Sequence, residues 1–347
     1  MKHFSKYLTI ALLSLLLLLL YNCSNDDNNS KDQNPLLGKW EAVSGSLLDG
    51  FIPNYIIFNN DSIGNLLFET ELGFKHNFET EYSVSESEVT FNLQGNIAYQ
   101  YTLDGETLTL TDQGSNIAQF QKNNNAPEVN EWIQELSILS QGNAPWEGVV
   151  DIAFTYDKTQ IVYGMNSTTT YIALINPENF EEVGQIPAEN RASVVEIEKY
   201  FGPDRYLFQS SGNSDLINYY TMNDGMYNDS IEIATEISGL ASINATQIWI
   251  SNNYDTNLYL YNYGNDTIEN QIDINITTYG LDYQNTFLYI SNGLNLFKCQ
   301  TSPEFKVVES YYIPDTDIYG IAYDGNNFWV SGNTNDGFKL IKTNLTL

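Results

Sequence analysis

The C-terminal part of the chain repeats itself with a period near 40 residues, and this repeat constrains the fold more than any other feature. The segments ISGLASINATQIWISNN, TTYGLDYQNTFLYISNG and DIYGIAYDGNNFWVSGN align along their whole length. A serine and an aromatic residue recur at this interval: Ser251, Ser291 and Ser331, and Trp249, Tyr289 and Trp329. Two more divergent copies precede them, VDIAFTYDKTQIVYGMN and SVVEIEKYFGPDRYLFQSSGN, with Ser211 placed 40 residues before Ser251. Five copies of one four-strand unit predict a β-propeller.

The last copy lacks an outer strand of its own, because the chain reaches Leu347 just after its third strand, FKLIKT. An unpaired strand edge is a liability that folded proteins avoid. Residues 132–140, WIQELSILS, precede the first copy and alternate between apolar and polar side chains. We therefore expect a propeller of five blades over residues 132–347, with residues 132–140 as the outer strand of the last blade. Six blades are the alternative.

A different pattern covers residues 36–122, where short runs with period-2 alternation are separated by turn residues. About eight such runs can be counted, and Asp104-Gly105 is a tight-turn dipeptide between YQYTL and TLTLT. Eight strands that follow one another in sequence predict a closed up-and-down barrel, because closure removes the edges. The Asn-rich residues 123–131 read as a linker. The whole chain is thus expected to be all-β.

Both predicted domains resemble known families. LLGKW, YTLDGETLTLT and the final FQK are similar to short lipocalin-like domains of bacterial surface lipoproteins, and Gly38-x-Trp40 matches the opening motif of lipocalins. The repeats resemble those of NHL and YVTN propellers, with G-[LI]-x-Y-D-G and [WY]-[VI]-S in the same places. The resemblances imply a small lipocalin-like barrel followed by a propeller. They leave the function open, because one fold hosts binders, scaffolds and enzymes.

The first 35 residues indicate export. Lys2 and Lys6 precede the almost unbroken apolar run Leu8–Leu20, which is shorter than the roughly 20 residues of a membrane-spanning helix. Cys23 follows at once, and this arrangement resembles a bacterial lipoprotein signal, with residues 1–22 as signal peptide. The resemblance implies that Cys23 carries lipid and that residues 23–35 form a polar tether. We expect a lipid-anchored protein of the cell envelope, on the outer membrane of a Gram-negative bacterium. An uncleaved helical anchor is the alternative.

Composition excludes several classes of function. The chain has 14 Lys and Arg against 44 Asp and Glu, a formal net charge of −30, so nucleic acid is not an expected partner. Its only histidines are His3 and His76, so the propeller contains neither a Ser-His-Asp triad nor a histidine-ligated metal. We expect His76 to be a solvated loop residue, and no cofactor. Calcium could be bound by oxygen ligands from loop residues, although a role in forming turns explains the same residues equally well. These residues are Asn252, Asn253, Asp255, Asn333 and Asp336.

One segment suggests an enzyme. Thr278-Tyr279-Gly280-Leu281-Asp282 resembles the T-Q-G-L-E segment on an inner strand of five-bladed glutaminyl cyclotransferases, with Tyr279 in place of the glutamine. Asp282 stands where the aligned copies have Ala241 and Ala322. The resemblance implies a catalytic carboxyl at Asp282, which burial could turn into a general base.

Propeller geometry also predicts a binding face, because the loops between second and third strands and the connections between blades open around one end of the channel. This face is expected to collect amide, carboxyl, hydroxyl and aromatic groups: Asn252, Asn253, Asn292, Asn333, Thr278, Tyr279, Asp317 and Tyr319. We favour a binding or scaffolding role at the envelope, with a glycan, a peptide or another envelope protein as partner. A cyclotransferase using Asp282 and a purely structural envelope protein are the alternatives.

Overall fold

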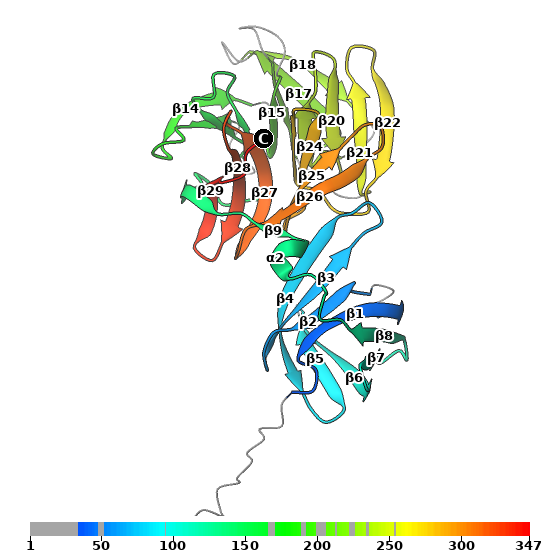
Figure 1. The fold of residues 1–347 in the computed structure, drawn as a ribbon. Coiled ribbons are helices and arrows are strands. Elements are labelled where there is room, and N and C mark those ends of the chain that lie inside the picture. Colours follow the sequence, from blue (N-terminus) through cyan, green and yellow to red (C-terminus); the bar gives the residue numbers. More distant parts are fainter. Residues whose placement is uncertain are drawn as a thin grey trace, which may run out of the picture. The chain divides into compact units, whose positions relative to one another are not determined.

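The computed structural model describes residues 34–47, 52–93, 95–165, 171–188, 192–198, 206–211, 214–221, 226–233, 236–252 and 255–347. The predicted signal peptide, Cys23 and most of the tether, as well as Asn253, lie outside these residues. The regular secondary structure of the described residues consists of strands and one short helix (Figure 1). It divides into two compact units, one made of residues up to Asn65 with Glu79–Asn124, the other of Leu66–Phe78 with Asn125–Leu347.

The eight predicted strands of the N-terminal part close into a barrel in which β1 pairs with β8. Strand β7, TLTLT, alternates between buried leucines and half-buried threonines, as a strand with one face on a core requires. Asp104 pairs with Thr107 across a two-residue turn, where Gly105 has a φ of 61°. The strands are β1 (Gly38–Gly45), β2 (Tyr55–Phe58), β3 (Ile63–Glu69), β4 (Lys75–Val84), β5 (Glu88–Asn92), β6 (Asn96–Asp104), β7 (Thr107–Thr111) and β8 (Ile117–Lys122).

Aromatic side chains fill the interior of this barrel. Trp40 of the Gly38-x-Trp40 motif is buried, and its indole N–H donates to the carbonyl oxygen of Leu36 at 2.7 Å. The rings of Phe58 and Phe91 stack with centroids 5.9 Å apart. The tryptophan of the lipocalin-like motif is therefore a core residue.

The propeller has five blades, as predicted, and in blades 1 to 3 the four strands follow one another in chain order from one edge of the sheet to the other. Blades 1 and 2 comprise β11 (Ile152–Phe154), β12 (Ile161–Tyr163), β13 (Tyr171–Ile175) and β14 (Glu182–Pro187), then β15 (Val194–Ile197), β16 (Tyr206–Ser210), β17 (Leu216–Thr221) and β18 (Tyr227–Glu232). Blades 3 and 4 comprise β19 (Gly239–Ser242), β20 (Gln247–Ser251), β21 (Asn257–Asn262) and β22 (Thr267–Asp273), then β23 (Gly280–Gln284), β24 (Phe287–Ser291), β25 (Leu296–Gln300) and β26 (Lys306–Tyr312). Blade 5 contains β27 (Thr316–Tyr323), β28 (Phe328–Thr334) and β29 (Gly337–Thr343).

The outer strand of blade 5 comes from before the repeats, but its bounds differ from the expected 132–140. Strand β10 (Ile138–Asn143) pairs antiparallel with β29, while β9 (Gln134–Glu135) adds to the edge of β26 in blade 4. Residues Val129–Trp132 form a short helix, α2. The side chain of Glu131 accepts the backbone N–H of Glu128 at 3.0 Å, and this contact at the first turn favours helix over strand.

Two serines of the repeat, Ser291 and Ser331, each join their blade to the next. The hydroxyl of Ser331 accepts the N–H of Gly320 at 2.8 Å and donates to the carbonyl oxygen of Val150 in blade 1 at 2.5 Å. Ser291 makes the same pair of bonds with the N–H of Gly280 and with Tyr319 of blade 5. The inner strands approach so closely here that a Cβ on Gly280 would lie 2.4 Å from the carbonyl oxygen of Tyr319. The 40-residue interval is therefore a packing constraint.

His76 is not the solvated loop residue expected from the sequence. It belongs to the second compact unit, where it is buried and one ring nitrogen lies 2.8 Å from the side-chain amide of Asn295. Burial lowers the pKa of His76 to about 4. Burial of His76 is not evident from the sequence, because the residues next to it, Lys75 and Asn77, are polar and the apolar partners of the ring are distant in sequence. One of these partners is Phe297, whose ring centroid lies 5.4 Å from that of His76.

Candidate functional site

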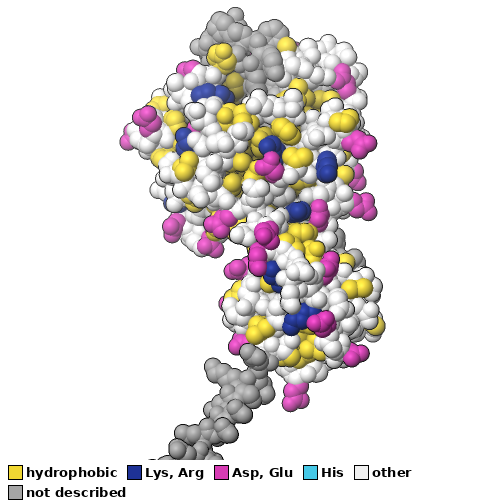
Figure 2. Space-filling model, in the orientation of Figure 1, with side chains coloured by type: hydrophobic (Ala, Val, Ile, Leu, Met, Phe, Trp, Pro, Cys, Tyr) yellow, Lys and Arg dark blue, Asp and Glu magenta, His cyan; other side chains and the backbone are white. Residues whose placement is uncertain are grey.

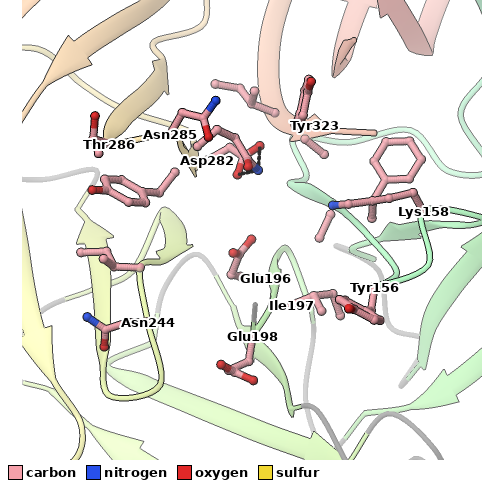
Figure 3. A pocket seen from close by; sticks show the side chains of 17 residues that line it. Tyr156, Lys158, Glu196, Ile197, Glu198, Asn244, Asp282, Asn285, Thr286 and Tyr323 are labelled. Atoms are coloured by element: carbon pink, nitrogen blue, oxygen red, sulfur yellow. Dashed lines mark hydrogen bonds between the residues drawn. The ribbon is translucent and has the colours of Figure 1, made fainter. Parts of the chain in front are cut away.

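A cavity of about 600 Å³ opens at the end of the channel where each inner strand turns into the second strand. All five blades contribute to it, so the cavity is a product of the ring (Figure 3). Its lining combines acidic, amide and aromatic side chains with one lysine: Ala153, Phe154, Tyr156, Lys158, Glu196, Ile197, Glu198, Ile243, Asn244, Asp282, Tyr283, Gln284, Asn285, Thr286, Ile321, Ala322 and Tyr323.

Glu196 and Asp282 occupy the same position of the repeat in blades 2 and 4. Each lies two residues beyond the inner-strand residue that pairs with the repeat serine, Val194 with Ser210 and Gly280 with Ser291. The other blades have alanine at this position: Ala153, Ala241 and Ala322. Small side chains in three blades leave room for two carboxyl groups from the other blades.

Asp282 is expected from the sequence, whereas Glu196 is not. The reason is the alignment of the divergent second copy on Ser211, because Ser210 is the residue that pairs with the inner strand. When the alignment of the second copy is shifted by one residue, Glu196 falls at the same position of the repeat as Asp282. Aligning the string SVVEIE on SGLASI of the next copy, with Ser193 on Ser238, would have placed Glu196 on Ala241 and revealed it.

Hydrogen bonds hold both carboxyl groups in place. Glu196 is buried, and its Oε1 accepts the backbone N–H of Ser242 in blade 3 at 3.0 Å. Asp282 is buried as well, and its two oxygens accept from the side-chain amide of Gln284 at 2.9 and 3.2 Å. In Figure 3 the side chains of Glu196, Asp282 and Lys158 reach towards the middle of the cavity from three blades.

A third acid, Asp151, lies two residues before Ala153, where blades 3, 4 and 5 have Gly239, Gly280 and Gly320. It is 2% exposed. One oxygen accepts the N–H of Ile152 at 2.9 Å, and the other has no partner within hydrogen-bond distance among the residues that the structure describes. Burial raises the pKa of Asp151 well above its usual range, and Glu196 and Asp282 raise it further. The three acids are thus near enough to influence one another, and Asp151 favours its protonated form.

The binding face expected from the sequence lies at the other end of the inner strands, and two of its residues line a second cavity of about 360 Å³ there. These are Asp317 and Asn333, whose backbones pair across β27 and β28. Asp315, Thr316, Thr334 and Asn335 also line it.

The remaining described residues proposed from the sequence shape turns or pack between neighbouring blades. The side-chain oxygen of Asn292 accepts the N–H groups of Leu294 and Asn295, which defines a turn. Thr278 is buried with its hydroxyl 3.4 Å from that of Ser238, and Asn252 is buried too. The rings of Tyr279 and Tyr319 meet edge to face at 5.5 Å. Burial raises the pKa of Tyr319 to about 12, and nearby Asp317 adds to the shift.

The calcium hypothesis gains no support from the loops. Asp255 accepts the N–H of Asn257 and the hydroxyl of Tyr259, as a turn-forming aspartate does. Asp336 lies in the β28–β29 turn, where its N–H donates to Thr334. Within the described ranges, no group of three or more His, Cys, Asp or Glu side chains is arranged to hold a metal ion.

Fold and cavity define a five-bladed propeller protein with an acidic channel mouth. No family model matches the chain, and no curated protein matches it in sequence. Among solved structures, glutaminyl cyclase from Myxococcus xanthus is similar with a TM-score of 0.51 at 12% identity, over 61% of this chain and 97% of that one. The WD40 repeats of RRP9 match with a TM-score of 0.40 at 7% identity, over 74% and 91%. The likeness to the glutaminyl cyclase shows the fold alone.

Figure 2 shows the Lys and Arg side chains as scattered single residues among more numerous acidic ones on the visible face. The part of the chain that the structure describes contains no helix long and apolar enough to cross a membrane.

Proposed function

We propose that this chain is an exported, lipid-anchored protein of the cell envelope whose propeller binds a small molecule in the cavity at the channel mouth. One observation carries the binding proposal: all five blades converge on a cavity whose volume lies in the range of small-molecule sites. The apolar run Leu8–Leu20 and Cys23 support export and anchoring. A flat, packed channel mouth would instead have favoured a scaffold.

The binding site can be tested with a ligand screen by thermal shift, followed by calorimetric titration of the hits. Tyr156 lines the cavity and is 64% exposed, so Tyr156→Ala should weaken binding by about 1 kcal/mol or more without loss of stability. Tyr227 on β18 is 42% exposed and lies outside the cavity lining, so Tyr227→Ala is the matched control. Hits whose affinity survives Tyr156→Ala but falls with substitutions at Asp317 or Asn333 would move the site to the second cavity.

A cyclotransferase is the second candidate, because Asp282 is a buried carboxyl at the channel and the fold resembles a glutaminyl cyclase. In such a reaction the α-amine of an N-terminal glutamine attacks its side-chain amide carbon. The new C–N bond closes a lactam, the bond from that carbon to the side-chain nitrogen breaks, and the proton lost by the amine leaves on that nitrogen as ammonia. Asp282 would carry that proton. Incubation with the peptide Gln-Phe-Ala should then release ammonia, and Asp282→Asn should abolish the release. If wild-type protein releases none, the enzyme is excluded and the binding proposal stands.

A further inference from the structure

We infer that residues Leu66–Phe78 form an acid-released latch, which packs on the propeller while His76 is neutral and separates from it when His76 gains a proton. This inference goes beyond the proposed function and does not depend on it, because none of the residues that line the channel-mouth cavity belongs to the latch. The latch bears instead on the second cavity.

The latch consists of the turn between β3 and β4 with the adjoining ends of both strands, and it belongs to the same compact unit as the propeller. Phe74 in the latch is fully buried in a cluster of apolar side chains from blades 3 and 4. Its ring meets that of Phe297 edge to face, with centroids 4.8 Å apart. The latch is therefore packed against blade 4 by its apolar side chains.

These contacts are separate from the hydrogen bonds that build the blade. The sheet of blade 4 runs from β23 to β26 and then β9, so its ladder is complete without the latch. Beyond this ladder, the amide of Val307 donates to the carbonyl oxygen of Leu72 at 3.2 Å, and the indole N–H of Trp132 donates to that of His76 at 3.2 Å. The latch can thus separate while the blade keeps its own hydrogen bonds.

The surroundings of His76 suit a neutral imidazole. The side chain is 9% exposed, and its ring contacts those of Phe297 and Phe78, with centroids 5.4 and 6.2 Å away. Nδ1 lies 2.8 Å from the side-chain nitrogen of Asn295. An amide nitrogen only donates, so Nδ1 accepts and the ring carries its single proton on Nε2. A second proton on Nδ1 would set two donors against each other and bury a charge, which is destabilising.

No opposite charge compensates that proton, because His76 has no ion pair among the residues that the structure describes. The charged residues on the surrounding elements are Lys75 and Glu79 of β4, Glu131 of α2, Lys298 of β25, and Asp315 and Asp317 at the second cavity. Lys75 lies over the ring of Trp132, 4.6 Å from its centroid, and Lys298 binds Glu309 at 2.8 Å. Burial accordingly lowers the pKa of His76 to about 4, against about 6.5 for a free histidine. Docking of the latch therefore weakens as the pH falls from about 6.5 to 4, by up to about tenfold per unit.

Release of the latch alters the second cavity. Asn77, the neighbour of His76 in the latch, lines this cavity, and so does Asn295, the partner of the His76 ring. Separation removes the part of the wall that Asn77 supplies. The second cavity is therefore more open in acid than at neutral pH.

Hydrogen exchange of single N–H groups, followed by NMR on the full-length protein at pH 7 and pH 5, tests the release. The Val307 amide and the Trp132 indole donate to the latch, so both exchange when it separates. After correction for the intrinsic exchange rates, their equilibrium constants for opening should rise about tenfold or more from pH 7 to pH 5. At pH 5 they should exceed, by about tenfold, the opening constant of the Ser238 amide, which donates to Ser251 in blade 3. In His76→Gln the rise with acid should fall to about threefold or less.

Asn295→Asp is a second variant, and it decides the outcome if the latch of His76→Gln does not dock at all. A carboxylate beside Nδ1 would pair with the protonated ring, so acid should open this latch about threefold or less. A wild-type latch that opens equally at both pH values, or a variant that opens as steeply as the wild type, would overturn the inference. Equal opening constants for Val307, Trp132 and Ser238 at pH 5 would also overturn it, because the proton would then open the propeller as a whole. None of these results would affect the ligand screen at the channel mouth.

Discussion

Replacing Asp151 with asparagine should make the propeller more stable, by an amount that grows with pH. In the folded protein, burial and two neighbouring acids raise the pKa of Asp151, so the unfolded chain gives up this proton at lower pH than the native state does. Between about pH 3.9, the usual pKa of aspartate, and the raised pKa of the native state, Asp151 therefore lowers the free energy of unfolding by about 1.4 kcal/mol per pH unit. Asparagine keeps the shape of the neutral acid and removes this dependence.

The assay is pulsed hydrogen exchange in urea at pH 5, 6, 7 and 8. Exchange is read on peptides that cover β11 and β15, so that unfolding of the propeller is measured separately from unfolding of the barrel. The free energy of unfolding of Asp151→Asn minus that of the wild type should rise with pH, by about 1.4 kcal/mol per unit at most, until the pH reaches the raised pKa of Asp151. Asp157→Asn is the control, because hydrogen bonds from Thr155 and Thr159 lower the pKa of Asp157 and its contribution is lost only in acid. A pH-independent difference for Asp151→Asn would refute the reasoning.

Three further predictions follow from other parts of the chain. Gly280→Ala should destabilise the propeller by about 1–3 kcal/mol, because the added Cβ would meet the backbone oxygen of Tyr319. In Gly184→Ala the added Cβ would meet only the side chain of Leu174, so this variant should lose less stability. Thermal unfolding compares the two variants. His76→Gln should reduce the loss of stability on acidification between about pH 6.5 and 4, because burial keeps His76 neutral in the folded protein while it gains a proton in the unfolded chain. Urea titrations at both pH values measure this loss, and an equal loss in the variant and the wild type would show that the reasoning is wrong. Cys23→Ala should abolish labelling by radioactive fatty acid and cause precursor to accumulate, and a labelled variant would contradict lipidation.

The fold could be predicted because its determinants are repetitive. One serine makes the same contacts in successive blades, and Ser291 and Ser331 each tie an inner strand to the following blade. A constraint imposed at the same place in successive blades produces a period in the sequence. This period can be seen without an alignment of homologous proteins. The bounds of the closing strand were less accurate, because the period-2 pattern of residues 132–140 does not reveal the helix that ends at Trp132.

The candidate site was harder to predict, because it consists of departures from the repeat. Asp151 and Glu196 replace a glycine and an alanine in the two most divergent copies, and an alignment error of one residue in the second copy hides Glu196. The asparagines chosen from the loops illustrate the opposite error, in which a residue that shapes a turn is interpreted as a binding residue. Asn292 has the side chain that a tight turn needs, and turn residues recur in every blade whether or not a ligand binds there.

Hydrogen exchange of the full-length protein with and without a bound small molecule tests the central claim most directly. Binding at the channel mouth predicts protection in peptides that cover residues 153–158, 196–198, 243–244, 282–286 and 321–323, drawn from all five blades. Peptides that cover residues 315–317 and 333–335 at the second cavity should be unchanged. Protection confined to those two peptides, or to the barrel strands, would contradict the account.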